Sequence, residues 1–182
     1  MFRVALNENV TRDDIDDAMF EGGFQLTDIV PAGDSHPYQM IYASADRSGL
    51  LYLIEDARLG LRYVQAVGGS QAQTLSFICD HLAVCTRESI ALQLASPDDL
   101  GAHARALYGL ALTTLPQTED EDAKTIESAL SHASPLIRRA ALIAVSYAPL
   151  PALRAPLARV AMSDPDVAIR AAAAEIASSV LR

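Results

Sequence analysis

The sequence predicts an α+β protein: a small antiparallel β-sheet with helices in the N-terminal part, followed by stacked helical repeats. Three segments rich in Tyr, Ile, Leu and Val follow one another between short turn signals, which is typical of antiparallel strands. Beyond Ser70 the apolar residues recur at helical spacing. Two segments near the C-terminus match at a fixed offset, which indicates a repeated helical unit.

The distribution of charge favours a basic partner. The chain has 182 residues and a net charge of −9. Residues 1–116 carry 15 acidic and 7 basic side chains, whereas residues 117–182 carry 8 and 7. An acidic N-terminal part repels phosphate backbones and anionic membrane surfaces and attracts a basic protein. We therefore expect a protein partner, no nucleic acid, no membrane and no cofactor.

Hydropathy and cysteine usage predict a soluble cytoplasmic protein. No apolar run approaches the roughly 18 residues that a spanning helix needs. The apolar stretch at the N-terminus ends at Asn7, which is too short for a signal peptide. Cys79 and Cys85 are six residues apart in a predicted helix, a spacing that disfavours a disulfide and predicts reduced thiols.

The N-terminal part begins with a predicted strand at residues 2–6 and a helix capped by Thr11. Gly22 and Gly23 supply the end of that helix, because glycine is the usual residue after a helix C-terminus. The apolar stripe of the helix is Ile15, Ala18 and Met19. Residues 24–30 are a candidate strand, followed by a loop at 31–37. Three more strands are predicted, joined by connections short enough for antiparallel hairpins: 38–44, 50–56 and 61–67.

The remainder is predicted to be helical. Ser70 caps a helix that extends to Cys85, and Pro97 begins the next one. The polar and acidic segment 116–123 is the best linker candidate. The later helices are expected at 122–131, 136–147, 150–162 and 166–181. These elements predict an α+β region at residues 1–96 and a helical region at residues 97–182, packed together.

A repeat becomes visible when Arg138 is aligned with Arg170, at an offset of 32 residues. "IRRAALIAV" then lies over "IRAAAAEIA", with Ile, Arg and an Ala pair matching. Arg105, 33 residues before Arg138, lies in a looser third copy. A period in the low thirties built of helix pairs is typical of a stacked α-solenoid.

With these residues the C-terminal part resembles HEAT-repeat proteins, in particular the short bacterial HEAT-like variety. The resemblance rests on Asp164, Pro165, Asp166, Ile169, Arg170 and the alanines that follow, and on their counterparts from Ile137 to Val145. It implies a short HEAT-like α-solenoid in which Arg105, Arg138, Asp164, Pro165 and Arg170 are structural repeat residues. The resemblance does not extend to the N-terminal α+β part.

The acidic cluster at residues 12–18 is the first candidate site. Asp13 and Asp17 are four residues apart on one helix face, and Asp14 lies in the first turn. Paired carboxylates can hold Mg²⁺ or Ca²⁺, but no second acidic cluster faces them in the sequence. We interpret Asp13, Asp14 and Asp17 as a solvated helix start with a hypothetical role in protein binding, and we predict no metal.

The hairpin at residues 50–67 is the second candidate site. It combines acidic, basic and aromatic side chains around a tight turn, and Tyr and Arg are enriched at interface hot spots. A polar outer face of an ordinary hairpin is the alternative. The hypothesis of a protein-binding edge assigns the following residues: Tyr52, Glu55, Asp56, Arg58, Arg62 and Tyr63.

The remaining chemical candidates are weak. His81 and Cys85 are helical neighbours by sequence spacing and could share a metal, but a closed zinc site needs four ligands. The stretch "AVGGSQAQ" lacks both common phosphate-loop patterns. No catalytic constellation is visible, so the sequence predicts no catalytic residues and no enzyme.

Two functions are the main candidates, and a third possibility is a domain that only helps a larger assembly to fold or hold together. The first is a non-catalytic protein-interaction module that binds and neutralises or regulates a basic protein, such as an immunity-type or regulatory protein. The alternative is a HEAT-like enzyme or cofactor handler, either bilin-lyase-like or metal-dependent. The net charge disfavours HEAT-like DNA glycosylases, and HEAT-like bilin lyases lack a strand-rich N-terminal part.

Overall fold

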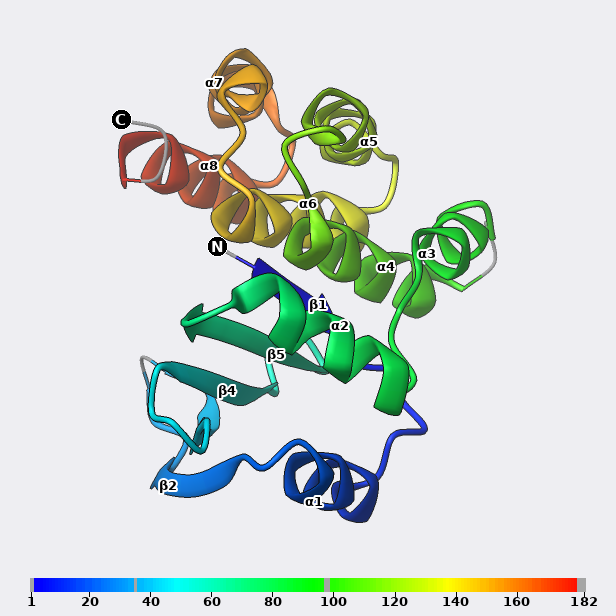
Figure 1. The fold of residues 1–182 in the computed structure, drawn as a ribbon. Coiled ribbons are helices and arrows are strands. Elements are labelled where there is room, and N and C mark those ends of the chain that lie inside the picture. Colours follow the sequence, from blue (N-terminus) through cyan, green and yellow to red (C-terminus); the bar gives the residue numbers. More distant parts are fainter. Residues whose placement is uncertain (1, 35, 97–98, 180–182) are drawn as a thin grey trace. The chain divides into compact units, whose positions relative to one another are not determined.

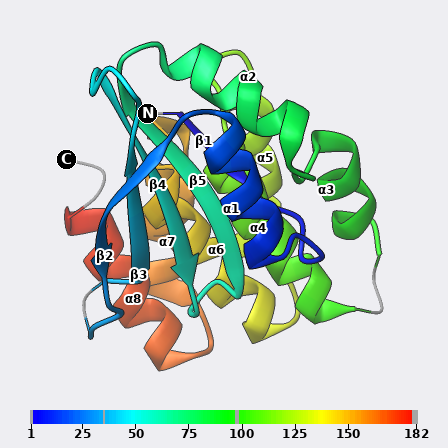
Figure 2. The same cartoon turned by 60° about the horizontal axis from the view of Figure 1, so that its bottom comes forward.

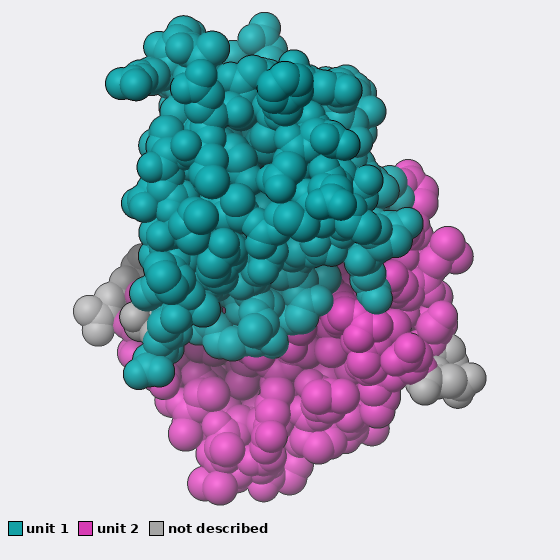
Figure 3. Space-filling view, turned by 90° about the horizontal axis from the view of Figure 1, so that it is seen from below, with its two compact units in different colours: residues 1–86 teal, residues 87–182 magenta. Residues whose placement is uncertain are grey.

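The computed structural model describes residues 2–34, 36–96 and 99–179 (Figure 1). The chain divides into two compact units, Met1–Thr86 and Arg87–Arg182, which Figure 3 colours separately. The second unit begins at Arg87, earlier than the boundary expected between residues 96 and 97. Pro97, expected to begin a helix, lies outside the described residues. Within the described residues no helix is long and apolar enough to cross a membrane.

The first unit is built on a five-stranded antiparallel sheet with the strand order β1-β5-β4-β3-β2 (Figure 2). Every strand predicted from the sequence is present, and the pairing of β3, β4 and β5 confirms the predicted hairpins. The strands are β1 (Phe2–Ala5), β2 (Gln25–Val30), β3 (Tyr38–Ala43), β4 (Gly49–Asp56) and β5 (Leu61–Gly68).

The first helix, α1 (Arg12–Glu21), begins at the cap predicted from the sequence. The Thr11 hydroxyl accepts a hydrogen bond from the Asp14 backbone N–H at 3.1 Å, and the Asp14 carboxylate accepts one from the Thr11 N–H at 2.7 Å. This reciprocal capping box satisfies two donors that the first helical turn would leave unpaired.

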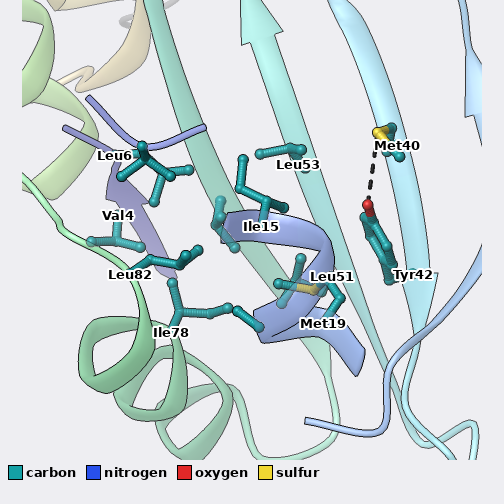
Figure 4. Packing of buried hydrophobic residues seen from close by; sticks show 13 residues of the cluster. Val4, Leu6, Ile15, Met19, Met40, Tyr42, Leu51, Leu53, Ile78 and Leu82 are labelled. Carbon is teal, nitrogen blue, oxygen red and sulfur yellow. Dashed lines mark hydrogen bonds between the residues drawn. The ribbon is translucent and has the colours of Figure 1, made fainter. Parts of the chain in front are cut away.

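One apolar core fills the space between the sheet and the helices α1 and α2 (Gln71–His81). Figure 4 shows Ile15 and Met19 of α1 and Ile78 of α2 pointing toward Leu51 and Leu53 of the central strand β4. Leu51 and Leu53 alternate along β4 with residues of the opposite face, because successive strand side chains point to opposite sides of a sheet. The face of the sheet that carries Leu51 and Leu53 is therefore the one that α1 and α2 cover.

The predicted helix 71–85 was wrong at its C-terminal end. The helix α2 ends at His81, and Leu82 has an extended backbone. The following residues pair with the chain just after β1: Asn7 N–H donates to the Ala83 carbonyl at 2.9 Å, and Cys85 N–H donates to the Ala5 carbonyl at 2.8 Å. These hydrogen bonds with a distant segment replace those of another helical turn. Leu82 and Cys85 are consequently not members of one helical stripe.

The second unit contains six α-helices within its described residues. Each odd-numbered helix packs against the next even-numbered one, and α4, α6 and α8 pack in series. In Figure 1 these three helices form one row, and α3, α5 and α7 form a second row beside it. The helices are α3 (Arg87–Leu94), α4 (Leu100–Thr113), α5 (Glu119–Leu130), α6 (Pro135–Tyr147), α7 (Arg154–Ser163) and α8 (Val167–Ser179).

Small side chains line the helix contacts of this unit. Ala140, Ala141 and Ala144 of α6 are buried, as is Ala173 of α8. Alanine lets the backbones of adjacent helices approach closely, because it adds only one carbon beyond the backbone. A short 3₁₀ turn at Pro151–Leu153 precedes α7. Residues 180 and 181, expected at the end of the last helix, lie outside the described residues.

The linker predicted at residues 116–123 was wrong, because α5 already begins at Glu119. Acidic residues in the first turn of a helix are stabilised by the positive end of its dipole, so a polar acidic segment need not be a linker. Asp122 in this segment is fully buried and accepts hydrogen bonds from Arg87 at 2.6 Å and from the Thr118 hydroxyl at 2.8 Å. The acidic residue thus ties α3 to α5.

Candidate protein-binding surface

The outer side of α1 combines three carboxylates with an exposed aromatic ring. Asp13, Asp16, Asp17 and Phe20 are all exposed, and they follow the spacing of one helix face. Ile15, Ala18 and Met19 point to the opposite side, into the core. We call Asp13, Asp16, Asp17 and Phe20 the acidic face of α1.

Phe20 distinguishes this face from an ordinary solvated helix. Its side chain is 85% exposed, although burying an aromatic ring is strongly favourable. The helical spacing places Phe20 beside Asp13, Asp16 and Asp17 and away from the apolar stripe. Phe20 is not among the candidate residues predicted from the sequence. A helical projection of residues 12–21 contains the signal, because it places an aromatic residue among the acids.

The carboxylates of α1 differ in how they are used. Asp14 serves the cap, and the hydrogen bonds from Thr11 lower its pKa. Asp16 accepts a hydrogen bond from the Tyr42 hydroxyl at 3.4 Å. Within the described part of the chain, neither Asp13 nor Asp17 accepts a hydrogen bond at its carboxylate or forms an ion pair. Their negative charges therefore face solvent uncompensated.

The basic residue of α1 points away from the acidic face. Arg12 pairs with Glu55 of β4 at 2.9 Å, contacts the Met40 sulfur, and lies 5.6 Å from the centre of the Tyr38 ring. A guanidinium above an aromatic ring is attracted to the negative face of its π system. Arg12 thus fixes α1 to the end of the sheet, and its charge is directed to Glu55 instead of Asp13 or Asp17.

The polar end of the β4–β5 hairpin lies on the same side of the sheet as α1. Glu55 is paired in register with Arg62 on β5 and with Tyr38 on β3. Arg62 donates hydrogen bonds to the backbone carbonyls of Val10 and, at 3.4 Å, Glu8. A hollow of about 550 Å³ opens here, lined by Tyr38, Glu55, Arg62 and the loop after β1.

Asp56 and Arg58 hold the hairpin turn together. The Asp56 carboxylate is buried and accepts a hydrogen bond from the Arg58 backbone N–H at 3.0 Å. The Arg58 guanidinium also reaches this carboxylate, at 3.3 Å. The two residues therefore stabilise the turn and are less available to a partner than the sequence hypothesis assumed.

Tyr52 and Tyr63 do not join the other hairpin residues. Tyr52 is half-buried and Tyr63 is buried, and both lie on the sheet face opposite Glu55 and Arg62. The predicted edge is consequently divided by the sheet. The structure brings Glu55 and Arg62 toward the acidic helix and separates the two tyrosines from it.

Metal and thiol chemistry finds little support in the geometry. The described residues contain no group of three or more His, Cys, Asp or Glu side chains that could hold a metal ion. The His81 ring stacks on Phe77 with 4.0 Å between ring centres, and Cys85 lies beyond the helix end. Burial raises the pKa of Cys79 and of Cys85, with nearby acids adding to the effect, so the reactive thiolate is disfavoured.

The predicted repeat residues lie in and beside the turns of the second unit. Arg138 donates to the Asp164 carboxylate, and it also donates to the backbone carbonyls of His132 and Ala133, both at 3.0 Å. Arg170 donates to the backbone carbonyls of Asp164 and Pro165. Arg105 is half-buried in α4.

Comparison with known proteins gave no relative: no family model, curated protein or solved structure matched the chain.

Proposed function

We propose that this protein is a non-catalytic interaction module that binds a basic protein partner through the acidic face of α1. One observation carries the proposal: Phe20 is 85% exposed among three exposed aspartates. An aromatic side chain at the centre of an interface is a frequent hot spot, and surrounding charges steer the partner toward it. The partner would supply Lys or Arg side chains around an apolar recess for the ring.

The uncompensated charges of Asp13 and Asp17 support a basic partner. Arg12, the nearest cation along the helix, is held by Glu55 on the sheet. A positively charged protein would therefore gain attraction from these carboxylates without having to displace an internal ion pair. Binding and neutralising a basic effector, as an immunity-type or regulatory protein does, is a biological role that fits this chemistry.

The proposal is tested by affinity capture from the source cell with three forms of the protein. The forms are the wild type, the double variant Asp13→Asn/Asp17→Asn and the single variant Asp120→Asn, whose exposed acid lies on α5 of the other unit. We expect one basic protein to be captured by the wild type and by Asp120→Asn, and much less by the double variant. Binding of the purified pair should weaken as salt rises, because salt screens charge attraction between surfaces.

The alternative outcomes are clear. A partner captured equally by all three forms would place its binding site elsewhere on the molecule. A partner that is acidic, or whose affinity does not change between low and high salt, would contradict the proposed chemistry. Recovery of no specific partner from the native cell would remove the basis for an interaction module.

We further propose that the second unit is a short HEAT-like α-solenoid. The pairing of α3 with α4, α5 with α6 and α7 with α8 supports this assignment, as does the serial packing of α4, α6 and α8. Arg138 and Arg170 each donate to the backbone carbonyls six and five residues before them, so the two copies use the same turn contact. An experimental structure with no constant rotation between successive pairs would contradict the assignment.

The proposal includes a cytoplasmic location. Its support is that Cys79 and Cys85 are both free thiols, which is usual where glutathione keeps cysteines reduced. Fractionation of the source cell, with the protein detected by antibody, tests this point. Recovery with a secreted or membrane fraction would contradict it.

A further inference from the structure

A hollow of about 370 Å³ in the second unit is lined by one lysine, two histidines and two hydroxyl side chains. It lies where α3, α4 and α5 meet the turn after α5. His103 comes from α4, Lys124 and Ser128 come from α5, and His132 comes from the turn. The lining is completed by Leu94, Thr125 and Ala129.

The lining of this hollow is basic, whereas the chain as a whole is acidic. Lys124 is the only lysine in a sequence whose net charge is −9. None of the described residues that line the hollow is acidic. Two of the acids one turn away on α5 are directed elsewhere: Glu121 lies 3.7 Å from Arg87, and Glu127 pairs with Arg159 at 2.6 Å. Asp120, four residues before Lys124, is exposed and does not line the hollow. Within the described part of the chain, Lys124 itself has no ion pair.

The hydrogen bonding of His132 leaves Nε2 as the donor nitrogen of its neutral ring. Its Nδ1 accepts a hydrogen bond from the Ser134 backbone N–H at 3.0 Å. In the neutral ring the proton must then sit on Nε2, because one ring nitrogen accepts and the other donates. A protonated Nε2 does not bind a metal ion, so this arrangement favours an anion over a metal.

The repeat explains why an anion would fit here. Shifted by 32 residues, His132 corresponds to Asp164 and Ser134 corresponds to Asp166. The Asp164 carboxylate accepts from the Asp166 backbone N–H at 2.8 Å, just as His132 accepts from Ser134. Asp164, however, also accepts from Arg138 of the preceding helix pair. At the turn before α6 the acid of that arrangement is replaced by a histidine.

A second hollow of about 470 Å³ shows the arrangement with the acid in place. It is lined by Arg138, Arg159, Asp164 and Pro156, and Pro156 stands 32 residues after Lys124. There the positive charge of Arg138 is neutralised within the protein by Asp164. His132 lines both hollows, and in the first one His103 and Lys124 lie in the lining together with it, with no acid among the described lining residues.

We propose that the hollow between α3, α4 and α5 binds a phosphate group, held by Lys124, His103 and His132. The ammonium of Lys124, the Nε2–H of His132 and the hydroxyl of Ser128 are donors that suit the oxygens of a small anion. The rings of His103 and His132 lie 5.7 Å apart between centres. An anion beside these rings would stabilise the charged form of His103 and accept a hydrogen bond from the Nε2–H of His132.

The unliganded state fits this assignment. Burial, followed by the nearby His132, lowers the pKa of His103. The groups that face His103 across the hollow are Lys124 of α5 and His132 of the turn, while α3 contributes the apolar Leu94. A bound anion counteracts both causes of the lowered pKa, so binding and protonation of His103 must promote each other.

The test is a titration of the full chain with inorganic phosphate, followed by NMR of the histidine ring protons at constant ionic strength. We expect saturable shifts of His103 and His132 but not of His36 or His81. A second titration with sulfate, whose charge is constant over this range, should raise the pKa of His103. Absence of saturable shifts at His103 and His132 with both anions would overturn the proposal.

Two variants and one control separate binding from folding. Lys124→Gln removes an exposed charge and should weaken phosphate binding about tenfold, the effect of losing one charge-assisted hydrogen bond. His132→Asp introduces the acid found at Asp164 and should abolish binding. Arg154→Gln makes the same charge change at an exposed site of α7 outside the hollow, and it should bind like the wild type.

The ligand class is decided by a third titration with acetate. Tighter binding of acetate than of phosphate would assign the hollow to a carboxylate and would contradict the proposed phosphate. Equal weakening by Lys124→Gln and Arg154→Gln would show only general charge attraction, and it would also overturn the proposal. Neither result depends on the acidic face of α1, which lies in the other unit.

Discussion

Arg138 holds Asp164 with two hydrogen bonds, from Nε at 2.7 Å and from Nη2 at 3.1 Å, and both side chains are almost fully buried. The remaining guanidinium nitrogen donates to two backbone carbonyls of the turn before α6. One arginine at the start of α6 thus ties its own turn to the turn before α8. A buried pair with its hydrogen bonds satisfied costs much to break from one side, because the other charge is left unpaired.

Replacing Arg138 should therefore destabilise the second unit more than replacing its exposed neighbour. We expect Arg138→Met to lower the free energy of unfolding by about 3 kcal/mol, since it leaves the Asp164 carboxylate buried without a cation. Arg139→Met removes a pair of the same length, Arg139 to Asp166 at 2.7 Å, but an exposed one, and should have a much smaller effect. Urea unfolding of both variants makes the comparison; equal losses would refute the structural role of the buried pair.

The same pair predicts a loss of stability in acid. Burial alone would raise the pKa of Asp164, but the hydrogen bonds from Arg138 and from the Asp166 N–H outweigh it and lower the pKa below the ordinary 3.8. Stability from this group is present above pH 3.8 and is lost as pH falls through the lower native value. Between pH 5 and pH 2 the melting temperature of Asp164→Asn should fall less steeply than that of the wild type. Thermal melts at fixed salt measure this difference. Parallel curves would contradict this linkage.

Tyr42 predicts a second pH effect, at the alkaline end. Burial, assisted by the negative charge of Asp16, raises its pKa to about 12 from the ordinary 10.0. Because the native state holds the proton more tightly, the stability contributed by Tyr42 should be constant below pH 10.0 and fall as pH rises toward about 12. Tyr42→Phe removes this contribution to the decline. The measurement is the unfolding midpoint in urea from pH 8 to 11.5, with Tyr52→Phe as the control.

Much of the first unit could be predicted from its sequence because its signals are local. The Thr11 cap, the glycines after α1 and the alternating strands each depend on neighbouring residues, and all are present in the structure. The end of α2 could not be predicted in this way. Ala83 and Cys85 leave the helix because they form hydrogen bonds with Asn7 and Ala5, which are distant in sequence.

In the candidate site, too, some features follow from local sequence and others depend on the three-dimensional structure. The exposure of Asp13 and Asp17 follows from helical spacing, and that spacing also places Phe20 among them. The separation of Tyr63 from Arg62 follows from the alternation of strand side chains, because neighbouring residues of a strand point to opposite faces of the sheet. The use of Asp56 by its own turn, in contrast, requires coordinates, because it depends on how the Arg58 side chain folds back.

Gly68 should tolerate alanine much less well than Gly23. Both have a positive φ, +71° and +68°, which a side chain disfavours. A Cβ on Gly68 would also lie 2.9 Å from the Ser48 carbonyl oxygen, whereas a Cβ on Gly23 would have no atom within 4 Å. We expect Gly23→Ala to cost about 1 kcal/mol from backbone strain alone and Gly68→Ala to cost more. Urea unfolding of both variants measures the difference, and a smaller loss for Gly68→Ala would contradict the close approach of the two strands.

Phe20→Ala should leave the fold intact and reduce partner binding. Because the ring is 85% exposed, its loss should change the free energy of unfolding by no more than about 0.5 kcal/mol. If the ring is the centre of the interface, its loss should weaken binding by at least about 2 kcal/mol, or roughly thirtyfold. Met162→Ala is the matched control, because Met162 is an apolar side chain 81% exposed on α7 of the other unit. Calorimetric titration with the captured partner measures both variants against the wild type. Equal affinities for wild type and Phe20→Ala would remove the ring from the interface, whereas a loss shared with Met162→Ala would assign the effect to general surface hydrophobicity.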